Sequence, residues 1–184
     1  MTSSIHELYR ELGADLGLDV PDIASYHSGP FSTAVVLSDP GGKFTAGSGA
    51  QTTQEIGVEN PDPTAAFLKN ACLEAGLDIH EYLPLNALAG FDLRPNNKNL
   101  RLCAKLNSQI IRVSGVRVVI LGGALARRSL DFLDIDRSVA VVEMPHPSRR
   151  GRANASRNGQ QGSTMVKAAF VQAKRIVSNS GANK

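Results

Sequence analysis

Short apolar segments typical of buried strands alternate with helix-forming segments along the chain, and this alternation limits most strongly which folds are open to it. The predicted strands cover residues 31–37, 81–89, 116–121 and 138–144. The predicted helices, recognised by apolar residues three and four positions apart, cover residues 4–16, 62–76, 98–113, 124–133 and 164–177. Alternating strands and helices predict an α/β fold. We expect a single three-layer α/β/α domain over residues 1–184, with a central, mostly parallel, four-stranded sheet.

The ends of several predicted elements carry recognisable signals. Ser4 is the predicted N-cap of the first helix, Asp62 is the N-cap of the second, and Gly76 ends the second. Residues 41–60 and 149–163 are polar and lack periodicity, so both are predicted to be loops. Long loops in compact domains are usually functional or mobile, which makes the first of them a candidate part of a site.

Length and composition exclude several classes of protein. The 184 residues suit one domain, and no apolar run approaches the roughly 20 residues that a membrane span needs. The first 15 residues carry acids and lack the pattern of a signal peptide, so an intracellular, cytoplasmic location is expected. The two cysteines, Cys72 and Cys103, exclude a disulfide framework, a four-cysteine zinc site and an all-cysteine iron–sulfur cluster. Both fall on predicted helices and are expected to be inert.

Charge is distributed very unevenly along the chain. Residues 1–92 contain three basic and thirteen acidic residues, whereas residues 93–184 contain seventeen basic and four acidic ones. From residue 144 to the end there are eight basic residues and no acid. This asymmetry has two interpretations. The basic half binds a polyanion, or the two halves interleave in space and neutralise each other.

Three predicted strand ends carry polar residues that a core does not need, namely Asp39, Asn86 and His146. The remaining strand end offers only Gly122 and Gly123. In a parallel α/β sheet, ligands bind beyond the carboxyl ends of the strands, so the three polar residues are the candidate site.

Several familiar chemistries lack their residues in this chain. No Ser or Cys occupies an obvious nucleophile turn, and the four histidines are scattered without metal-ligand spacing. The glycines after Asp39 lack the Lys-Ser/Thr of a phosphate-binding loop.

The side chains that remain at the strand ends are one acid, one amide and one imidazole. An amide can read the edge of a nucleobase, an imidazole can stabilise negative charge on a base carbonyl, and a carboxylate can stabilise a sugar cation or activate water. Cleavage of an N-glycosidic bond requires these three tasks.

Three segments resemble the motifs of the uracil-DNA glycosylase superfamily and occur in the same order. Residues 37–42 (LSDPGG) resemble the water-activating motif, and residues 83–87 (LPLNA) resemble the strand whose Asn reads the uracil edge. Residues 145–148 (PHPS) resemble the motif that opens the loop inserted into DNA. Residues 67–97 look most like the bacterial and archaeal family that carries an iron–sulfur cluster, and residues 118–133 are similar to the strand and helix between the second and third motifs.

The resemblance implies a role for each matching residue. Asp39 and His146 correspond to catalytic residues. The residues expected to bind the substrate base are Ser38, Pro40, Gly41, Phe44 and Asn86. The residues expected to contact DNA are Gly42, Pro147, Ser148, Arg149, Arg150, Arg152 and Arg157. The four arginines also stand among Gly, Asn and Ser with no acid nearby, a composition that suits phosphate contact. They follow a strand end directly, so they and the closing helix are expected on the side of the carboxyl ends of the strands.

The chain departs from the family, and two of the departures bear on its cofactor and its substrate. The cluster-bearing family uses four cysteines and this chain has two, so no cofactor and no metal are expected. Position 41 is Gly where the enzymes that exclude thymine have Tyr, so the resemblance does not imply exclusion of thymine.

The sequence therefore predicts a monomeric DNA-repair glycosylase, intracellular and associated with the nucleoid. It flips a deaminated base, uracil or a relative, from DNA and hydrolyses the glycosidic bond without a metal. DNA containing a deaminated or damaged base is the expected partner, and no membrane is expected. Two alternatives stay open. The chain is a nucleic-acid-binding relative with weak or no catalysis, or it hydrolyses small nucleotides or nucleosides on a similar scaffold.

Overall fold

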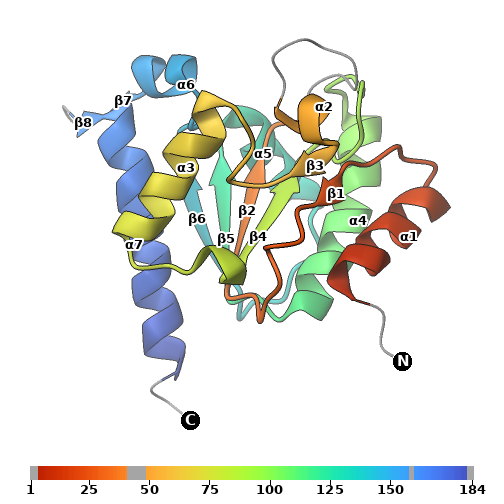
Figure 1. Ribbon diagram of the computed structural model, residues 1–184, viewed down its shortest axis with the longest axis horizontal. Helices are drawn as coiled ribbons and strands as arrows, with labels where there is room; N and C mark the ends of the chain where they lie inside the picture. The colour runs from red at the N-terminus through yellow and green to blue at the C-terminus, as the bar shows by residue number, and fades with distance from the viewer. Residues whose placement is uncertain (1–3, 41–48, 158–159, 182–184) are drawn as a thin grey trace.

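Four parallel strands form the centre of the molecule and lie in the order β4-β2-β5-β6 (Figure 1). The computed structural model describes residues 4–40, 49–157 and 160–181. The strands of the sheet are β2 (Thr33–Leu37), β4 (Tyr82–Asn86), β5 (Val118–Gly122) and β6 (Ala140–Met144). All three neighbouring pairs are parallel. The predicted three-layer α/β/α architecture around a mostly parallel four-stranded sheet is confirmed.

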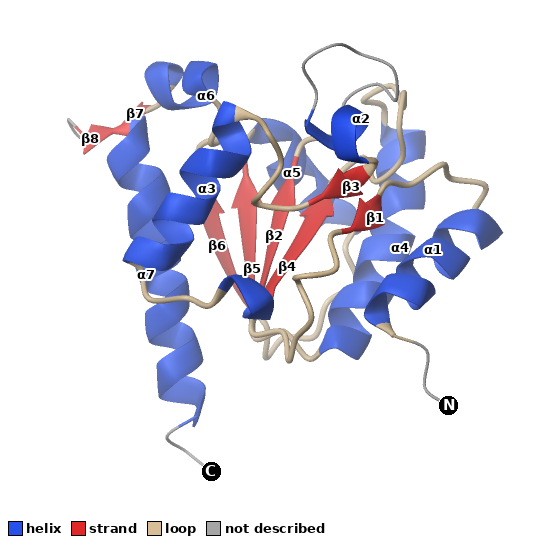
Figure 2. Cartoon of the chain, viewed as in Figure 1, coloured by secondary structure: helices blue, strands red, loops and turns tan. Residues whose placement is uncertain are grey.

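Helices cover both faces of this sheet, as Figures 1 and 2 show. They are α1 (Ile5–Asp15), α3 (Pro63–Glu74), α4 (Asn97–Ser114), α5 (Ala124–Ser129) and α7 (Gly162–Gly181). α1, α4 and α5 pack on one face, in a core that includes Tyr9, Leu106 and Ala126. α3 and α7 pack on the other, around Leu68 and Phe170. Because both faces are covered, β2, β4 and β5 are almost entirely buried and show apolar runs instead of alternation.

The helix ends follow the signals in the sequence. Ser4 caps α1 in a capping box with Glu7, and the Asp62 carboxylate accepts hydrogen bonds from two backbone N–H groups at the start of α3. The Asn96 side chain likewise caps α4, and Gly115 ends α4 with a φ of 71°. These caps satisfy backbone groups that a helix end leaves without partners.

Both segments predicted as loops contain regular structure. Residues 41–60 include α2 (Gly49–Thr53) and β3 (Glu55–Ile56), and β3 pairs in parallel with β1 (Asp22–Ile23). Residues 149–163 include α6 (Arg149–Asn154), the short β7–β8 hairpin (Ser156–Arg157 and Gln160–Gln161) and the start of α7. These elements are too short to show apolar periodicity, so the sequence carried no signal for them. Two single-turn 3-10 helices, Ile79–Glu81 and Leu130–Phe132, complete the chain.

The two cysteines lie on helices, as predicted, and both are free and buried. Burial raises the pKa of Cys72 to about 12 and also raises the pKa of Cys103, so both thiols stay protonated near neutral pH. None of the helices within the described residues is long and apolar enough to cross a membrane.

Candidate functional site

A cavity of about 510 Å³ opens at the carboxyl ends of β2 and β4. It is lined by residues at the ends of these two strands, by the first turns of α3 and by residues 56–60. Side chains on a strand alternate between the two faces of the sheet, so Tyr82, Pro84 and Asn86 point to the same face of β4. Tyr82 belongs to the core between the sheet and α3, which puts Asn86 on the cavity side of the strand.

The residues predicted at the strand ends meet at this cavity. Asp39 follows β2, Asn86 ends β4 and His146 follows β6, and all three line the cavity together with Ser38 and Pro40. Asn86 is in register with Leu37, two residues before Asp39. The parallel sheet therefore brings together residues that lie far apart in the sequence.

The pair of glycines at the end of β5, Gly122 and Gly123, allows these residues to meet, because β5 lies between β2 and β6. Gly123 donates its N–H to the carbonyl oxygen of Met144 (N···O 3.0 Å) and has a φ of 93°, which favours glycine. A Cβ added at Gly123 would lie 3.0 Å from the Cβ of His146. These two glycines stand at the strand end that carries no polar residue. Gly123 leaves the space that His146 occupies, whereas a Cβ at Gly122 would meet the Leu37 and Met144 side chains.

The Asn86 amide lies at the cavity wall and has no hydrogen-bond partner among the described residues. Its residue is only 5% exposed. The backbone oxygen of Asn86 accepts a hydrogen bond from Asn107 Nδ2 (2.8 Å), whereas none of the residues that the structure describes hydrogen-bonds to the Asn86 amide. Asn86 lines the cavity, so its amide is free to donate to and accept from a ligand that enters there.

His146 is held in one tautomer by its own turn. The backbone N–H of Ser148 donates to His146 Nδ1 (3.2 Å), so the neutral ring carries its proton on Nε2. Burial lowers the pKa of His146, and the nearby Asp39 carboxylate partly opposes that shift. Near neutral pH the ring is therefore an uncharged donor with Nε2–H available.

Helix α6 fixes the His146 turn from outside. Ser148 caps the helix, its Oγ accepting the N–H of Gly151 (3.1 Å). A Cβ added at Gly151 would overlap the His146 carbonyl oxygen and lie 2.8 Å from its Cβ. Glycine at position 151 thus allows the helix to pack directly on the histidine. The sequence did not predict a role for Gly151, and no local pattern marks it.

The arginines predicted to contact DNA have different surroundings. Arg149 and Arg150 are exposed on α6, and neither forms an ion pair within the described parts of the chain. The Arg152 guanidinium lies 3.9 Å above the centre of the Phe67 ring and donates to the Pro147 carbonyl oxygen. Arg152 thus ties α6 to α3 and is less free to reach a phosphate than its neighbours.

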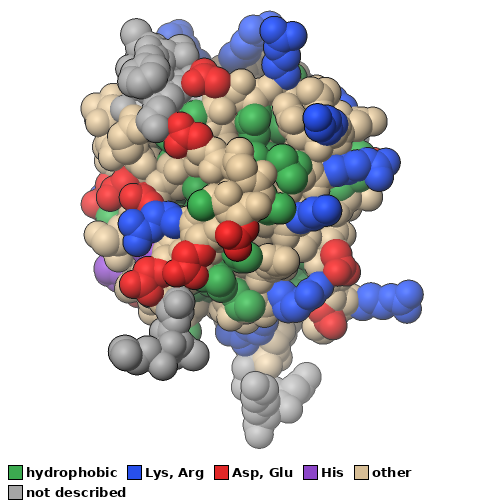
Figure 3. Space-filling view, turned by 90° about the vertical axis from the view of Figure 1, so that its right-hand side faces the viewer, with side chains coloured by type: hydrophobic (Ala, Val, Ile, Leu, Met, Phe, Trp, Pro, Cys, Tyr) green, Lys and Arg blue, Asp and Glu red, His purple; other side chains and the backbone are tan. Residues whose placement is uncertain are grey.

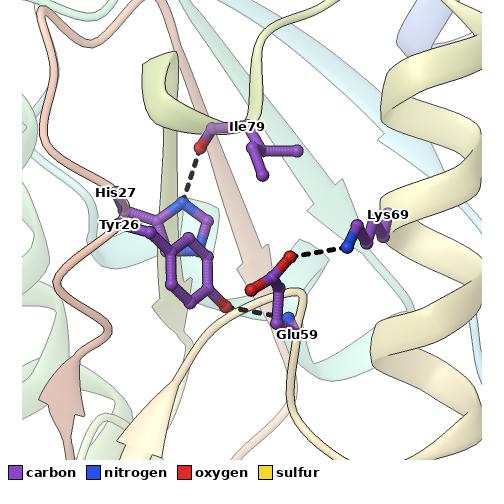
Figure 4. Close-up of polar contacts among 5 residues, drawn as sticks. All are labelled: Tyr26, His27, Glu59, Lys69 and Ile79. Atoms are coloured by element: carbon purple, nitrogen blue, oxygen red, sulfur yellow. Dashed lines mark hydrogen bonds and ion pairs between the residues drawn. The ribbon is translucent and has the colours of Figure 1, made fainter.

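Residues 56–60 form one wall of the cavity, and Figure 4 shows the polar contacts of Glu59 within this segment. The Tyr26 hydroxyl accepts the backbone N–H of Glu59 (2.8 Å), and the Glu59 carboxylate pairs with Lys69 of α3 (2.5 Å). A Cβ added at Gly57 would overlap the Tyr26 hydroxyl oxygen, so only glycine fits there. Next to Tyr26, His27 Nδ1 donates to the Ile79 carbonyl oxygen (2.7 Å). These contacts hold the wall in place without a ligand.

Four of the predicted site residues cannot be placed in full. Gly41, Gly42 and Phe44 lie outside the described residues. Arg157 is placed only by its backbone, in β7. Within the described residues, no group of three or more His, Cys, Asp or Glu is arranged to hold a metal ion.

No family model matches this chain, and no curated protein matches it in sequence.

Proposed function

We propose that this chain is a DNA glycosylase. It flips a deaminated base, uracil or a relative, out of DNA and hydrolyses the N-glycosidic bond, with no metal and no cofactor. The observation that carries the proposal is the convergence of a carboxylate, an amide with no partner among the described residues and an imidazole with a lowered pKa on one cavity of about 510 Å³. The resemblance of the three motifs to the uracil-DNA glycosylase superfamily points the same way, because these are the residues that its motifs supply.

Asn86 is the residue that selects the base in this proposal. Its amide presents a donor and an acceptor side by side, and so does the edge of uracil, with the roles reversed. Its burial makes the selection strict, because a base that leaves either group unpaired incurs the desolvation cost of that group. In the orientation that pairs with uracil, the Asn86 amide meets a base of the cytosine pattern donor to donor and acceptor to acceptor, so that base is rejected.

His146 and Asp39 act on the bond in this proposal. The His146 Nε2–H donates to a carbonyl oxygen of the base and stabilises the negative charge that grows there as the bond breaks. The Asp39 carboxylate stabilises the positive charge that grows on the sugar and orients water toward it. Water adds its hydroxyl to the sugar C1′ and its proton goes to the base, so the products are a free base and an abasic site.

A panel of oligonucleotides, each bearing one lesion, tests this proposal. Uracil, hydroxymethyluracil, hypoxanthine and thymine opposite guanine are presented in single and double strands. Free base is measured by mass spectrometry and abasic sites by alkaline cleavage. We expect release of uracil or a close relative, and no release of normal bases from matched DNA.

The alternatives give different results in the same panel. Binding to every oligonucleotide with no base release overturns catalysis and favours a binding relative. Hydrolysis of free nucleosides or nucleotides, with no affinity for DNA, favours a small-molecule hydrolase on the same scaffold.

A further inference from the structure

The arginines of α6 are only some of the basic residues in the second half of the chain. Between residues 93 and 134 the sequence has eight basic and two acidic residues, and the motifs of the candidate site use none of them. Of these acids, Asp134 pairs with Arg112 (2.7 Å), while Arg127 pairs with Glu143 of β6 (3.9 Å). The other cations in this segment have no ion-pair partner among the described residues.

Four of these cations gather where α4 begins and α5 ends. They are Arg94, Lys98, Arg101 and Arg128, all of them exposed. None of the four forms an ion pair with the residues that the structure describes. We call this set the α4–α5 basic surface.

Interactions between the two helices hold this surface together. Arg128 Nη2 donates to Asn97 Oδ1 on the first turn of α4 (2.9 Å). The Arg101 guanidinium lies 4.7 Å above the Phe132 ring, in the 3-10 turn that follows α5. Asn99 Nδ2 donates to the Arg94 carbonyl oxygen (3.0 Å), which fixes the segment before α4. Like charges repel, so collecting four of them that form no ion pair with the described residues lowers the stability of the fold.

The surface lies at the same end of the sheet as the cavity. α4 begins after the loop that leaves the carboxyl end of β4 (Figure 1), and α5 begins directly after Gly123, which lies against His146. Figure 3, which looks onto the side of α1 and α4, shows basic side chains mainly along the top and right and acidic ones mainly on the left. On this face basic and acidic side chains therefore lie mainly in different areas.

We propose that the α4–α5 basic surface binds the sugar–phosphate backbone of DNA that extends from the cavity, beyond the part of the duplex that α6 reaches. This inference rests on the proposed function for the identity of the polyanion. Lys98 and Arg101 are three residues apart and so lie on one side of α4, with Arg128 beside them. Such a surface adds affinity for all sequences and takes no part in base selection.

The test uses two variants with the same change in net charge. Lys98→Gln combined with Arg128→Gln removes two cations from the surface. Lys174→Gln combined with Arg175→Gln removes two from α7, near Val177, whose carbonyl accepts from Arg117 at the amino end of β5. Binding to an undamaged 24-base-pair duplex is measured across a salt series. We expect the logarithmic salt slope to flatten by about 0.9 for each phosphate that is no longer bound, about 1.8 in all, in the first variant and to be unchanged in the second.

The outcomes separate this inference from the proposed function. Equal slopes for both variants, or no binding of the duplex by the unaltered chain, overturn the basic surface. Binding that depends on Lys98 and Arg128 without any base release supports the surface and overturns the glycosylase. If the double variant melts early, Lys98→Glu alone, at an exposed helix position, must weaken binding to all sequences alike for the inference to hold.

Discussion

Asn86 allows a structural role to be told from a functional one, because its amide lines the cavity and has no hydrogen-bond partner among the described residues. Asn86→Leu should leave the melting temperature unchanged or raise it, since the change removes an unpaired polar group next to an open cavity. The same variant should lose base release completely. Thermal melts and release assays on one preparation check both results. A clear drop in melting temperature would show that the amide stabilises the fold.

Asn86→Asp tests the recognition of the base edge itself. The carboxylate has no donor, so pairing with uracil is weakened, while a base that presents the cytosine pattern is better tolerated. We expect uracil release to fall by more than about tenfold, which corresponds to roughly one missing hydrogen bond. Asn70→Asp, at an exposed position of α3, is the matched control. Unchanged selectivity in the Asn86 variant would contradict the assignment.

His27 predicts a pH dependence of stability that is independent of the site. Burial is the main cause that lowers its pKa from 6.5 to about 4, and the charges of His6 and His80 contribute. Below pH 6.5 the unfolded chain takes up the proton and the folded chain does not. The free energy of unfolding should therefore fall as the pH drops from about 6.5 to about 4, by at most about 3 kcal/mol.

Denaturant unfolding at a series of pH values measures this effect. Acidic residues also contribute below about pH 5, so the difference between the unaltered chain and His27→Gln isolates the histidine. Parallel curves for the two proteins would contradict the role of His27.

Helix α6 is a short element that supports the site by packing on His146. Gly151→Ala must displace the helix or the histidine, because the new Cβ would overlap the His146 carbonyl oxygen. We expect base release to fall by about tenfold or more, as small displacements of catalytic groups are costly, with little change in melting temperature. Asn154→Ala, exposed on the same helix, is the control and should behave like the unaltered chain. Equal rates for both variants would show that α6 does not position His146.

The long elements were predictable from sequence and the short ones were not. Apolar spacing and caps such as Asp62 predicted α1, α3 and α4. These helices bury a continuous stripe of apolar side chains against the sheet. α6 and β3 are too short for an apolar period and depend on tertiary packing, so their segments looked irregular. The closing helix also differs from expectation. It was expected at the carboxyl ends of the strands, whereas α7 runs along the sheet and only its start lies there (Figure 1).

The candidate site was predictable where it lies at strand ends and unpredictable where it depends on space. Asp39, Asn86 and His146 stand out because polar residues end apolar strands, and a parallel sheet gathers such ends. Gly123 and Gly151 leave no such mark, since their role is defined by the atoms of His146 that they admit. The stacking of Arg152 on Phe67 was equally unpredictable, because it joins two helices that are distant in the sequence.

The distribution of charge over the molecule predicts how it approaches DNA. Arg149 and Arg150 lie on α6, which packs on the turn of His146, and have no acidic partner in the described chain. Replacing both with Ala should weaken binding to damaged and undamaged DNA alike and flatten the logarithmic salt slope by about 0.9 for each phosphate released. Base selectivity should be unchanged. A slope equal to that of the unaltered chain, measured on an undamaged duplex, would exclude α6 from phosphate binding.

The central claim is that strand-end residues around one cavity break the glycosidic bond of a flipped base. Single-turnover release of uracil from a 24-base-pair duplex, with protein in excess, measures that step directly. We predict release by the unaltered chain and a rate at least about 10² lower for Asp39→Asn, with equal DNA affinity. Asp136→Asn, exposed and far along the chain, should keep the full rate. No release by the unaltered chain, or equal rates for the Asp39 variant and the unaltered chain, would contradict the account.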